Sequence, residues 1–239
     1  MLLWEWLSTP IDPARAHSVG ALVSWHGRGM ALAWGVMIPT GVVIARYFKV
    51  LPWQDWPRQL DNRVWWRAHL GLQLGGFAIA LLALLAIIVA QGGVTARMTH
   101  SVLGWLVMGL ATAQVLSGYL RGTKGGPTDA APDGTWHGDH YDMTQRRLIF
   151  ELVHKSLGHG AILAAAAALL AGLWLANAPR WMWIAQLVYW AALAVLALWY
   201  ERRGPRPTTH EAIWGPKAPK EADRTADRAA LRSVQPPRE

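Results

Sequence analysis

Four histidines lie near the starts of four successive apolar stretches, and their rings could ligate a metal. His26 occurs in VSWHGRGM, His69 in WWRAHLGLQ, His100 in RMTHSVLGW and His154 in RRLIFELVHKSLG. A neutral imidazole nitrogen is the commonest metal ligand in proteins. A single histidine in an apolar helix can also serve only to hydrogen-bond a neighbouring helix. The recurrence of one histidine in each of four stretches favours ligation of a cofactor.

These histidines must be positioned by long helices. The chain is 53% hydrophobic and contains 16 tryptophans. Five stretches lack Asp, Glu, Lys and Arg: residues 29–45, 68–95, 98–120, 156–179 and 181–200. Each is near or within the roughly 17–25 residues that a helix needs to cross a bilayer. The sequence therefore predicts an all-α integral membrane protein, a bundle of five transmembrane helices of which four form the histidine-bearing core.

The two ends of the chain differ in composition from the apolar region. Residues 1–19 have neither a basic start nor a long apolar middle, so we expect no cleaved signal peptide and interpret them as an N-terminal extramembrane segment. Residues 20–200 form the predicted transmembrane domain. Residues 201–239 are rich in Pro, Lys, Arg and Glu without apolar periodicity, which predicts a basic, disordered tail. The sequence has no cysteine, which excludes disulfides and thiolate ligands.

Basic residues are distributed unevenly between the two faces of the predicted bundle. The connections on the N-terminal side contain Arg15, Arg97 and Arg180, whereas the opposite connections and the tail contain most of the 23 Lys and Arg residues. Lys and Arg are enriched on the cytoplasmic side of membrane proteins. We therefore expect a cytoplasmic C-terminus and a periplasmic N-terminus in a bacterial inner membrane. The net charge of +8 then reflects this orientation and does not indicate nucleic-acid binding.

Neighbouring transmembrane helices run in opposite directions, which sorts the histidines into two pairs. His26 and His100 are expected near the outer face, and His69 and His154 near the cytoplasmic face. Two imidazoles from facing helices can ligate a haem iron from both sides. The pairs therefore predict two haems b at levels on the order of 20 Å apart, given the 1.5 Å rise per residue. Two haems stacked along the membrane normal could relay an electron across the bilayer, and we assign no catalytic residue beyond these ligands.

A fifth histidine, His159, follows His154 by five residues. Positions five apart on an α-helix differ by about 140° around its axis, so both rings cannot face one iron. His154 is nearer the end of its helix, at a depth that matches His69. We expect His154 to be the ligand and His159 to be a core or relay residue.

The apolar region resembles the cytochrome b561 family, in the form that accompanies DOMON domains in eukaryotes and stands alone in bacteria. The segment WHGRGMALAWGVMIPTGVVIARYFK resembles the first core helix of that group, and WWRAHLGLQ, THSVLGW and RRLIFELVHKSLG resemble the other three. The resemblance covers about residues 20–200. It implies that His26 and His100 ligate one haem b and that His69 and His154 ligate the other.

Two details of the fourth motif bear on this resemblance. The H-x-x-x-G spacing of His154 and Gly158 supports His154 over His159 as the ligand. The sequence departs from the eukaryotic form at Phe150 and Glu151, where that form often has Trp-Asn. We expect no DOMON domain and no helix ahead of the first core helix in this chain, so a donor or acceptor bound by those parts is not implied.

Other polar residues have both a functional and a structural interpretation. Arg28, inside the outer end of the first helix, is predicted to pair with a haem propionate, because a buried arginine needs a counter-charge. Arg67, two residues before His69, could bind a propionate or an anionic donor, or could only signal orientation. His137 and His140 in WHGDHYD have the composition of a metal site, but a solvated loop is the simpler interpretation. Pro39 is expected to kink the first helix.

Together these features predict transmembrane electron transfer through two bis-histidine haems b, with ascorbate, quinol or ferric iron as the substrates to consider. Two alternatives remain open. One is a quinol-oxidising cytochrome or the haem-bearing membrane anchor of a larger oxidoreductase. The other is a haem-free membrane scaffold or transporter that uses its histidines for hydrogen bonding or proton transfer. The expected partners are membrane lipid and a small-molecule or protein electron donor and acceptor, without nucleic acid, and a homodimer is one assembly that the sequence allows.

Overall fold

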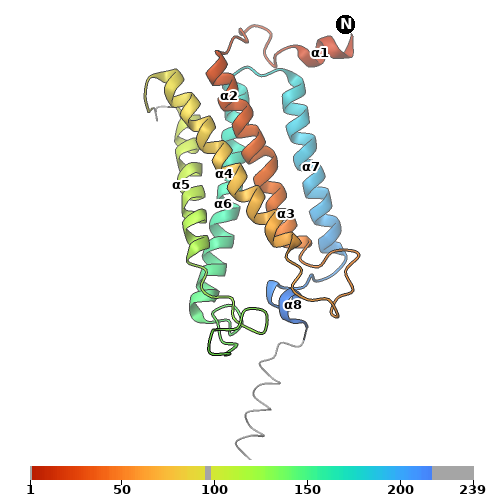
Figure 1. Cartoon of the computed structure of the whole chain (residues 1–239). Helices are drawn as coiled ribbons and strands as arrows, with labels where there is room; N and C mark the ends of the chain where they lie inside the picture. Colours follow the sequence, from red (N-terminus) through yellow and green to blue (C-terminus); the bar gives the residue numbers. More distant parts are fainter. Residues whose placement is uncertain (1, 95–97, 217–239) are drawn as a thin grey trace, which may run out of the picture.

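The computed structural model describes residues 2–94 and 98–216, in which the regular structure is helical (Figure 1). In chain order the elements are α1 (Leu3–Ser8), α2 (Ala21–Met30), the π-helix η1 (Ala31–Met37), α3 (Ile38–Tyr47), α4 (Val64–Gln91), α5 (Thr99–Tyr119), α6 (Gln145–Leu175), α7 (Arg180–Arg202) and α8 (Thr209–Trp214). Helices α2, η1 and α3 follow one another without a break and form one long helix.

In the described part of the chain, five helices are long and apolar enough to cross a membrane, which confirms the predicted bundle. They are Ala21–Tyr47, Val64–Gln91, Thr99–Tyr119, Gln145–Leu175 and Arg180–Arg202. The short helices α1 and α8 lie at opposite ends of the bundle (Figure 1). We call these ends the α1 end and the α8 end. The predicted basic residue Arg97 lies outside the described residues.

The helices pack as two pairs that meet near mid-depth. Helix α2 packs along α4, α5 packs along α6, and η1 joins the pairs through contacts with both α4 and α6. Small residues permit the close approach of α2 and α3 to α4: a Cβ at Gly29 would lie 2.8 Å from Ala83 Cβ, and one at Gly76 would lie 2.9 Å from Ile38 Cγ1. The buried core at mid-depth consists of Ala33, Trp34, Ile38, Ala80, Val107, Met108, Ala111, Ala161 and Ala165.

Pro39 determines how α7 attaches to this core. Proline has no N–H, so it cannot donate to the carbonyl of Gly35 four residues earlier, and the π-helix η1 ends just before it. The Gly35 carbonyl accepts two hydrogen bonds from α7, from Gln186 Nε2 at 3.1 Å and from Trp190 Nε1 at 3.0 Å. The sequence predicted a kink at Pro39, and the structure has a π-helix just before this residue. The Gly35 carbonyl, which Pro39 cannot bond, instead accepts hydrogen bonds from α7.

A buried asparagine fixes the N-terminal segment at the α1 end. Asn177, in the turn between α6 and α7, is 1% exposed. Its side-chain nitrogen donates to the carbonyls of Asp12 (2.9 Å) and Arg15 (2.7 Å), and its oxygen accepts from the Asp12 amide (3.1 Å). Because all of these groups are paired, burial of the amide stabilises the attachment of residues 9–15 to the bundle.

The prediction of a disordered tail is wrong for its first part. Helix α8 is ordered, and its residues Ala212, Ile213 and Trp214 are buried. Trp214 packs against Tyr141 of the α5–α6 connection, with ring centroids 5.4 Å apart. The six apolar and polar residues of α8 are too few to show a helical period in the sequence, and their partner lies more than 60 residues away. The rest of the predicted tail, residues 217–239, lies outside the described residues.

Candidate functional site

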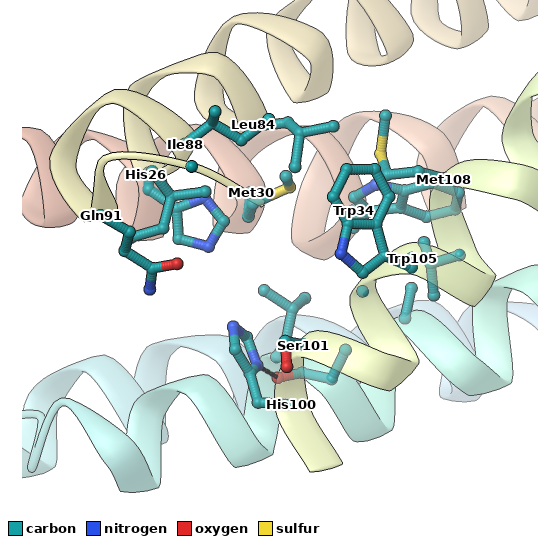
Figure 2. Close-up of a pocket in the computed structure, with 17 residues that line it drawn as sticks. His26, Met30, Trp34, Leu84, Ile88, Gln91, His100, Ser101, Trp105 and Met108 are labelled. Carbon is teal, nitrogen blue, oxygen red and sulfur yellow. Dashed lines mark hydrogen bonds between the residues drawn. The ribbon is translucent and has the colours of Figure 1, made fainter. Parts of the chain in front are cut away.

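His26 and His100 face each other across a pocket near the α1 end (Figure 2). His26 comes from α2 and His100 from α5, and their ring centroids are 6.1 Å apart with planes at 86°. Two imidazoles on opposite sides of one metal atom, each at a metal–nitrogen distance of ~2 Å, have centroids roughly 6 Å apart. The observed separation therefore fits one metal atom between these rings.

The hydrogen bonds of these two rings determine which nitrogen is free. Nδ1 of His26 lies 3.0 Å from the carbonyl oxygen of Ala83, and Nδ1 of His100 lies 2.9 Å from that of Ala168. A carbonyl oxygen can only accept a hydrogen bond, so each Nδ1 carries the hydrogen and each Nε2 keeps its lone pair. A metal-ligating histidine typically donates its other N–H in this way, which fixes its ring and raises its basicity.

The pocket between these histidines suits a large, flat, apolar group. It encloses about 730 Å³ of empty space, part of it open to the surroundings, and its walls are mainly apolar. A Cβ at Gly104, which lines the pocket, would meet no other atom within 4 Å. Trp34 also lines it and is 5% exposed, and its Nε1 is buried without a hydrogen-bond partner in the described part of the chain. The residues present therefore fit a haem.

A second pair, His69 and His154, lies near the α8 end. Nδ1 of His69, on α4, lies 3.0 Å from the Gly41 carbonyl, so its Nε2 is also the free nitrogen. Nδ1 of His154, on α6, lies 3.0 Å from the hydroxyl of Ser117 on α5. The two histidines are close enough for their charged forms to repel each other. Each ring thus has one nitrogen bonded to the protein, as in the first pair.

Aromatic and basic side chains surround the second pair. The Trp66 ring lies 6.1 Å from the His69 ring, and Phe150 stacks on His154 with centroids 5.1 Å apart. The guanidinium of Arg121 lies 4.6 Å from the centre of Trp66, and that of Arg147 lies 5.0 Å from the centre of Phe150. The aromatic neighbours of Arg121 and Arg147 follow from the packing and could not be predicted from the sequence.

The positions of the two pairs along one helix give their separation. His26 and Gly41 lie fifteen residues apart on the continuous helix α2–η1–α3. The Gly41 carbonyl is hydrogen-bonded to His69, so it marks the level of the second pair. At 1.5 Å per residue this spacing corresponds to about 20 Å along the helix axis. Trp34 stands midway, eight residues after His26 and seven before Gly41. The two pairs therefore lie at different depths, with the buried core between them.

Three of the residues singled out from the sequence are exposed. Arg28 was expected to be buried and is exposed, with its guanidinium 5.7 Å from the centre of the Trp25 ring. Arg67 is also exposed. The prediction that His159 is a core residue is wrong, because its side chain is exposed on α6. The structure thus separates His154, which faces the interior, from His159, which faces outward.

Of the two histidines of the α5–α6 connection, His140 is buried in a packed cap and His137 is exposed, and they do not gather as a metal site. In residues 2–94 and 98–216 no three or more His, Cys, Asp or Glu residues are grouped to hold a metal ion. A haem iron needs only two protein ligands, because the porphyrin supplies the other four. His140 packs on Trp214 with ring centroids 4.9 Å apart. Burial, followed by the nearby Arg147, lowers the pKa of His140 to about 3, so it is neutral at pH 7.

Comparisons with known proteins give relatives that share the apolar region. The sequence is 30% identical over 148 residues, 62% of this chain, to a cytochrome b561, DM13 and DOMON domain-containing protein of Arabidopsis thaliana. It is 30% identical over 178 residues, 72% of this chain, to ferric-chelate reductase 1 of Bos taurus. The matched segments make up only 14% and 26% of these relatives. No family model matches the sequence, and no solved structure matches it.

Proposed function

Because the chain is related to the cytochrome b561 family, we propose that it moves electrons across a membrane through two bis-histidine haems b. His26 and His100 would hold one haem near the α1 end, and His69 and His154 the other near the α8 end. The family relation implies haem b as a cofactor and an electron donor and acceptor as partners. The number of haems and their ligands are our proposal.

The observation that carries this proposal is the hydrogen bonding of the four histidines. Each Nδ1 is bonded to the protein, to Ala83, Ala168, Gly41 or Ser117, which leaves each Nε2 available as a ligand. Four neutral imidazoles with the same free nitrogen, in two pairs at two depths, suit ligation better than unrelated helix contacts.

The side chains around each pair have distinct roles in this proposal. Bound haem b supplies an iron that gains and loses one electron. The two imidazoles of each pair would hold the haem from both sides and leave no iron position for substrate. The carbonyls of Ala83, Gly41 and Ala168 and the hydroxyl of Ser117 would hold the rings in place as the charge at the iron changes. Trp34 and the core around it keep the space between the two levels packed and free of water.

The electron donor and acceptor are proposed by chemical class. Relatives of this chain are named ferric-chelate reductases, and a ferric chelate is the acceptor we propose. Arg121 and Arg147, next to the second pair, could attract an anionic donor or bind a haem propionate. Arg28 and Arg67 remain proposed propionate partners. The excess of basic residues at the α8 end supports a cytoplasmic location for that end.

A haem count on purified protein tests the proposal. We expect two haems b per chain in the parent by the pyridine haemochrome assay, and about one in His26→Ala or His154→Ala. His159→Ala is the matched control, because this histidine is exposed on the same helix as His154, and it should keep both haems. A parent without haem after haem-sufficient expression would overturn the proposal in favour of a haem-free scaffold or transporter.

A further inference from the structure

One of the four histidines is bonded to a side chain, whereas the other three are bonded to backbone carbonyls. Nδ1 of His154 lies 3.0 Å from Ser117 Oγ. The acceptors of the other three, Ala83, Gly41 and Ala168, are main-chain oxygens that no substitution removes. Hydroxyl oxygens both donate and accept, so this contact alone does not reveal which ring nitrogen of His154 carries the hydrogen.

A second hydrogen bond of Ser117 resolves this ambiguity. Ser117 Oγ lies 2.9 Å from the carbonyl oxygen of Gln114, one turn earlier on α5, to which the hydroxyl can only donate. The hydroxyl has one hydrogen, so its lone pair must accept the hydrogen of His154 Nδ1. Nε2 of His154 therefore keeps its lone pair. Ser117 gives His154 the same tautomer that the backbone gives the other three histidines.

The same turn of α5 also holds the backbone of His154. Gln114 Nε2 donates to the His154 carbonyl at 2.8 Å. The turn from Gln114 to Ser117 thus binds His154 at both its main chain and its ring. When the far N–H of a metal-ligating histidine donates a hydrogen bond, the electron density on the ligating nitrogen rises, which stabilises oxidised iron.

From these contacts we propose that Ser117 is a positioning residue that selects the tautomer of His154 and lowers the midpoint potential of the haem near the α8 end. This inference rests on the proposed haem ligation by His154. Among the four proposed ligands, His154 is the one whose ring is hydrogen-bonded to a side chain, so a substitution can remove its partner. Loss of the acceptor should weaken the ligand and raise the potential of that haem alone.

The test is a redox titration of the two-haem protein with absorbance detection, in the parent and in Ser117→Ala and Ser117→Thr. We expect Ser117→Ala to raise one of the two midpoint potentials and to leave the other unchanged. The single-haem His26→Ala protein identifies the shifted component as the haem near the α8 end. Ser117→Thr keeps a hydroxyl and should keep the parent potential. Equal shifts in Ser117→Ala and Ser117→Thr, or no shift in either, would overturn the proposal.

Thr112→Ala is the matched control for the loss of a hydroxyl from α5. Thr112 Oγ1 donates to the Met108 carbonyl at 2.9 Å, four residues earlier, in the same kind of helix contact, but no hydrogen bond joins it to a histidine in the described residues. Thr112→Ala should leave both midpoint potentials unchanged. A shift of the same component in Thr112→Ala would overturn the proposal, because it would mean that any loosening of α5 moves the potential.

A second measurement separates this inference from the haem proposal. Nitrogen-15 NMR of histidine-labelled protein prepared without haem reports which ring nitrogen carries the hydrogen, because an iron bound to Nε2 would itself hold the hydrogen on Nδ1. We expect the Nδ1–H form for His154 in the parent and in Ser117→Thr, and a mixture of tautomers in Ser117→Ala. An unchanged tautomer in Ser117→Ala would overturn the role of Ser117, whereas absence of haem from the parent would overturn only the ligation on which the potential depends.

Discussion

Gln186 donates from its side-chain nitrogen to the carbonyl oxygen of Gly35 at 3.1 Å and so joins α7 to the π-helix in the middle of the bundle. The contact depends on the absence of a side chain at Gly35, because a Cβ there would lie 2.3 Å from Gln186 Oε1. It also depends on Pro39, which cannot bond that carbonyl. At this level of the bundle, the attachment of α7 therefore depends on Gly35, Pro39 and the side chains of Gln186 and Trp190.

Gly35→Ala should destabilise the protein. The added methyl group overlaps the Gln186 amide, and overpacking of this kind typically costs ~1–3 kcal/mol. We expect a lower thermal unfolding midpoint, measured in detergent by the fluorescence of the tryptophans. Gly160→Ala is the control, because its Cβ would meet no atom within 4 Å. Equal midpoints for the two variants would contradict this account of how α7 is attached.

Trp34→Leu should slow electron transfer between the two proposed haems without changing the haem count. Trp34 is buried midway between His26 and Gly41, and the smaller leucine would leave a gap in the path. Electron tunnelling is slower across a gap than through packed atoms. Flash reduction of one haem, followed by absorbance of the other, measures this rate. Trp25→Leu, at an exposed position, should leave it unchanged, and a rate insensitive to Trp34→Leu would exclude this path.

Gly172→Ala should disturb the proposed haem site near the α1 end. A Cβ at Gly172 would lie 3.0 Å from His100 Cε1 and 3.4 Å from its Nδ1, so the ring would have to move away from the Ala168 carbonyl. In the parent, the 86° angle between the His26 and His100 planes predicts a strongly anisotropic low-spin EPR signal. We expect the variant to lose or shift this signal. Gly109→Ala, with open space around its Cβ, should retain it.

Acid should loosen the cap formed by α8 and the α5–α6 connection. The pKa of His140 is lowered from 6.5 to about 3, chiefly by burial. Between these values the unfolded chain binds a proton on this residue that the folded chain does not, so stability falls as the pH drops through this window. The total effect is on the order of a few kcal/mol.

Proteolysis of the α5–α6 connection at pH 7 and pH 5 measures this effect. We expect faster cleavage at pH 5 in the parent and a smaller difference in His140→Gln, which cannot be protonated. The lowered pKa of Asp139, caused first by the Thr123 amide, adds an acid sensitivity only below about 4, its ordinary range. If the cleavage rate of His140→Gln differed between pH 7 and pH 5 as much as that of the parent, the acid effect would come from other groups.

The sequence predicted the five membrane helices because hydropathy and the absence of charge are local properties. It also predicted the pairing of His26 with His100 and of His69 with His154, since antiparallel neighbours place every second helix start at the same depth. It could not predict the exposure of Arg28 and His159, because the rotation of a helix depends on its neighbours. In these helices the side that faces the bundle interior is about as apolar as the side that faces lipid, so the sequence does not show which side is turned inward.

The sequence by itself determined that this is a membrane protein, how many helices are expected to cross the membrane and at which depths its histidines lie. Only the tertiary structure decided which nitrogen of each histidine is free, because Ala83, Gly41, Ala168 and Ser117 lie on other helices from the rings that they bind. It also decided the order of α8 and the binding of α7 to the Gly35 carbonyl. These features depend on hydrogen bonds and packing between segments far apart in the chain, and such contacts leave no periodic signal in the sequence.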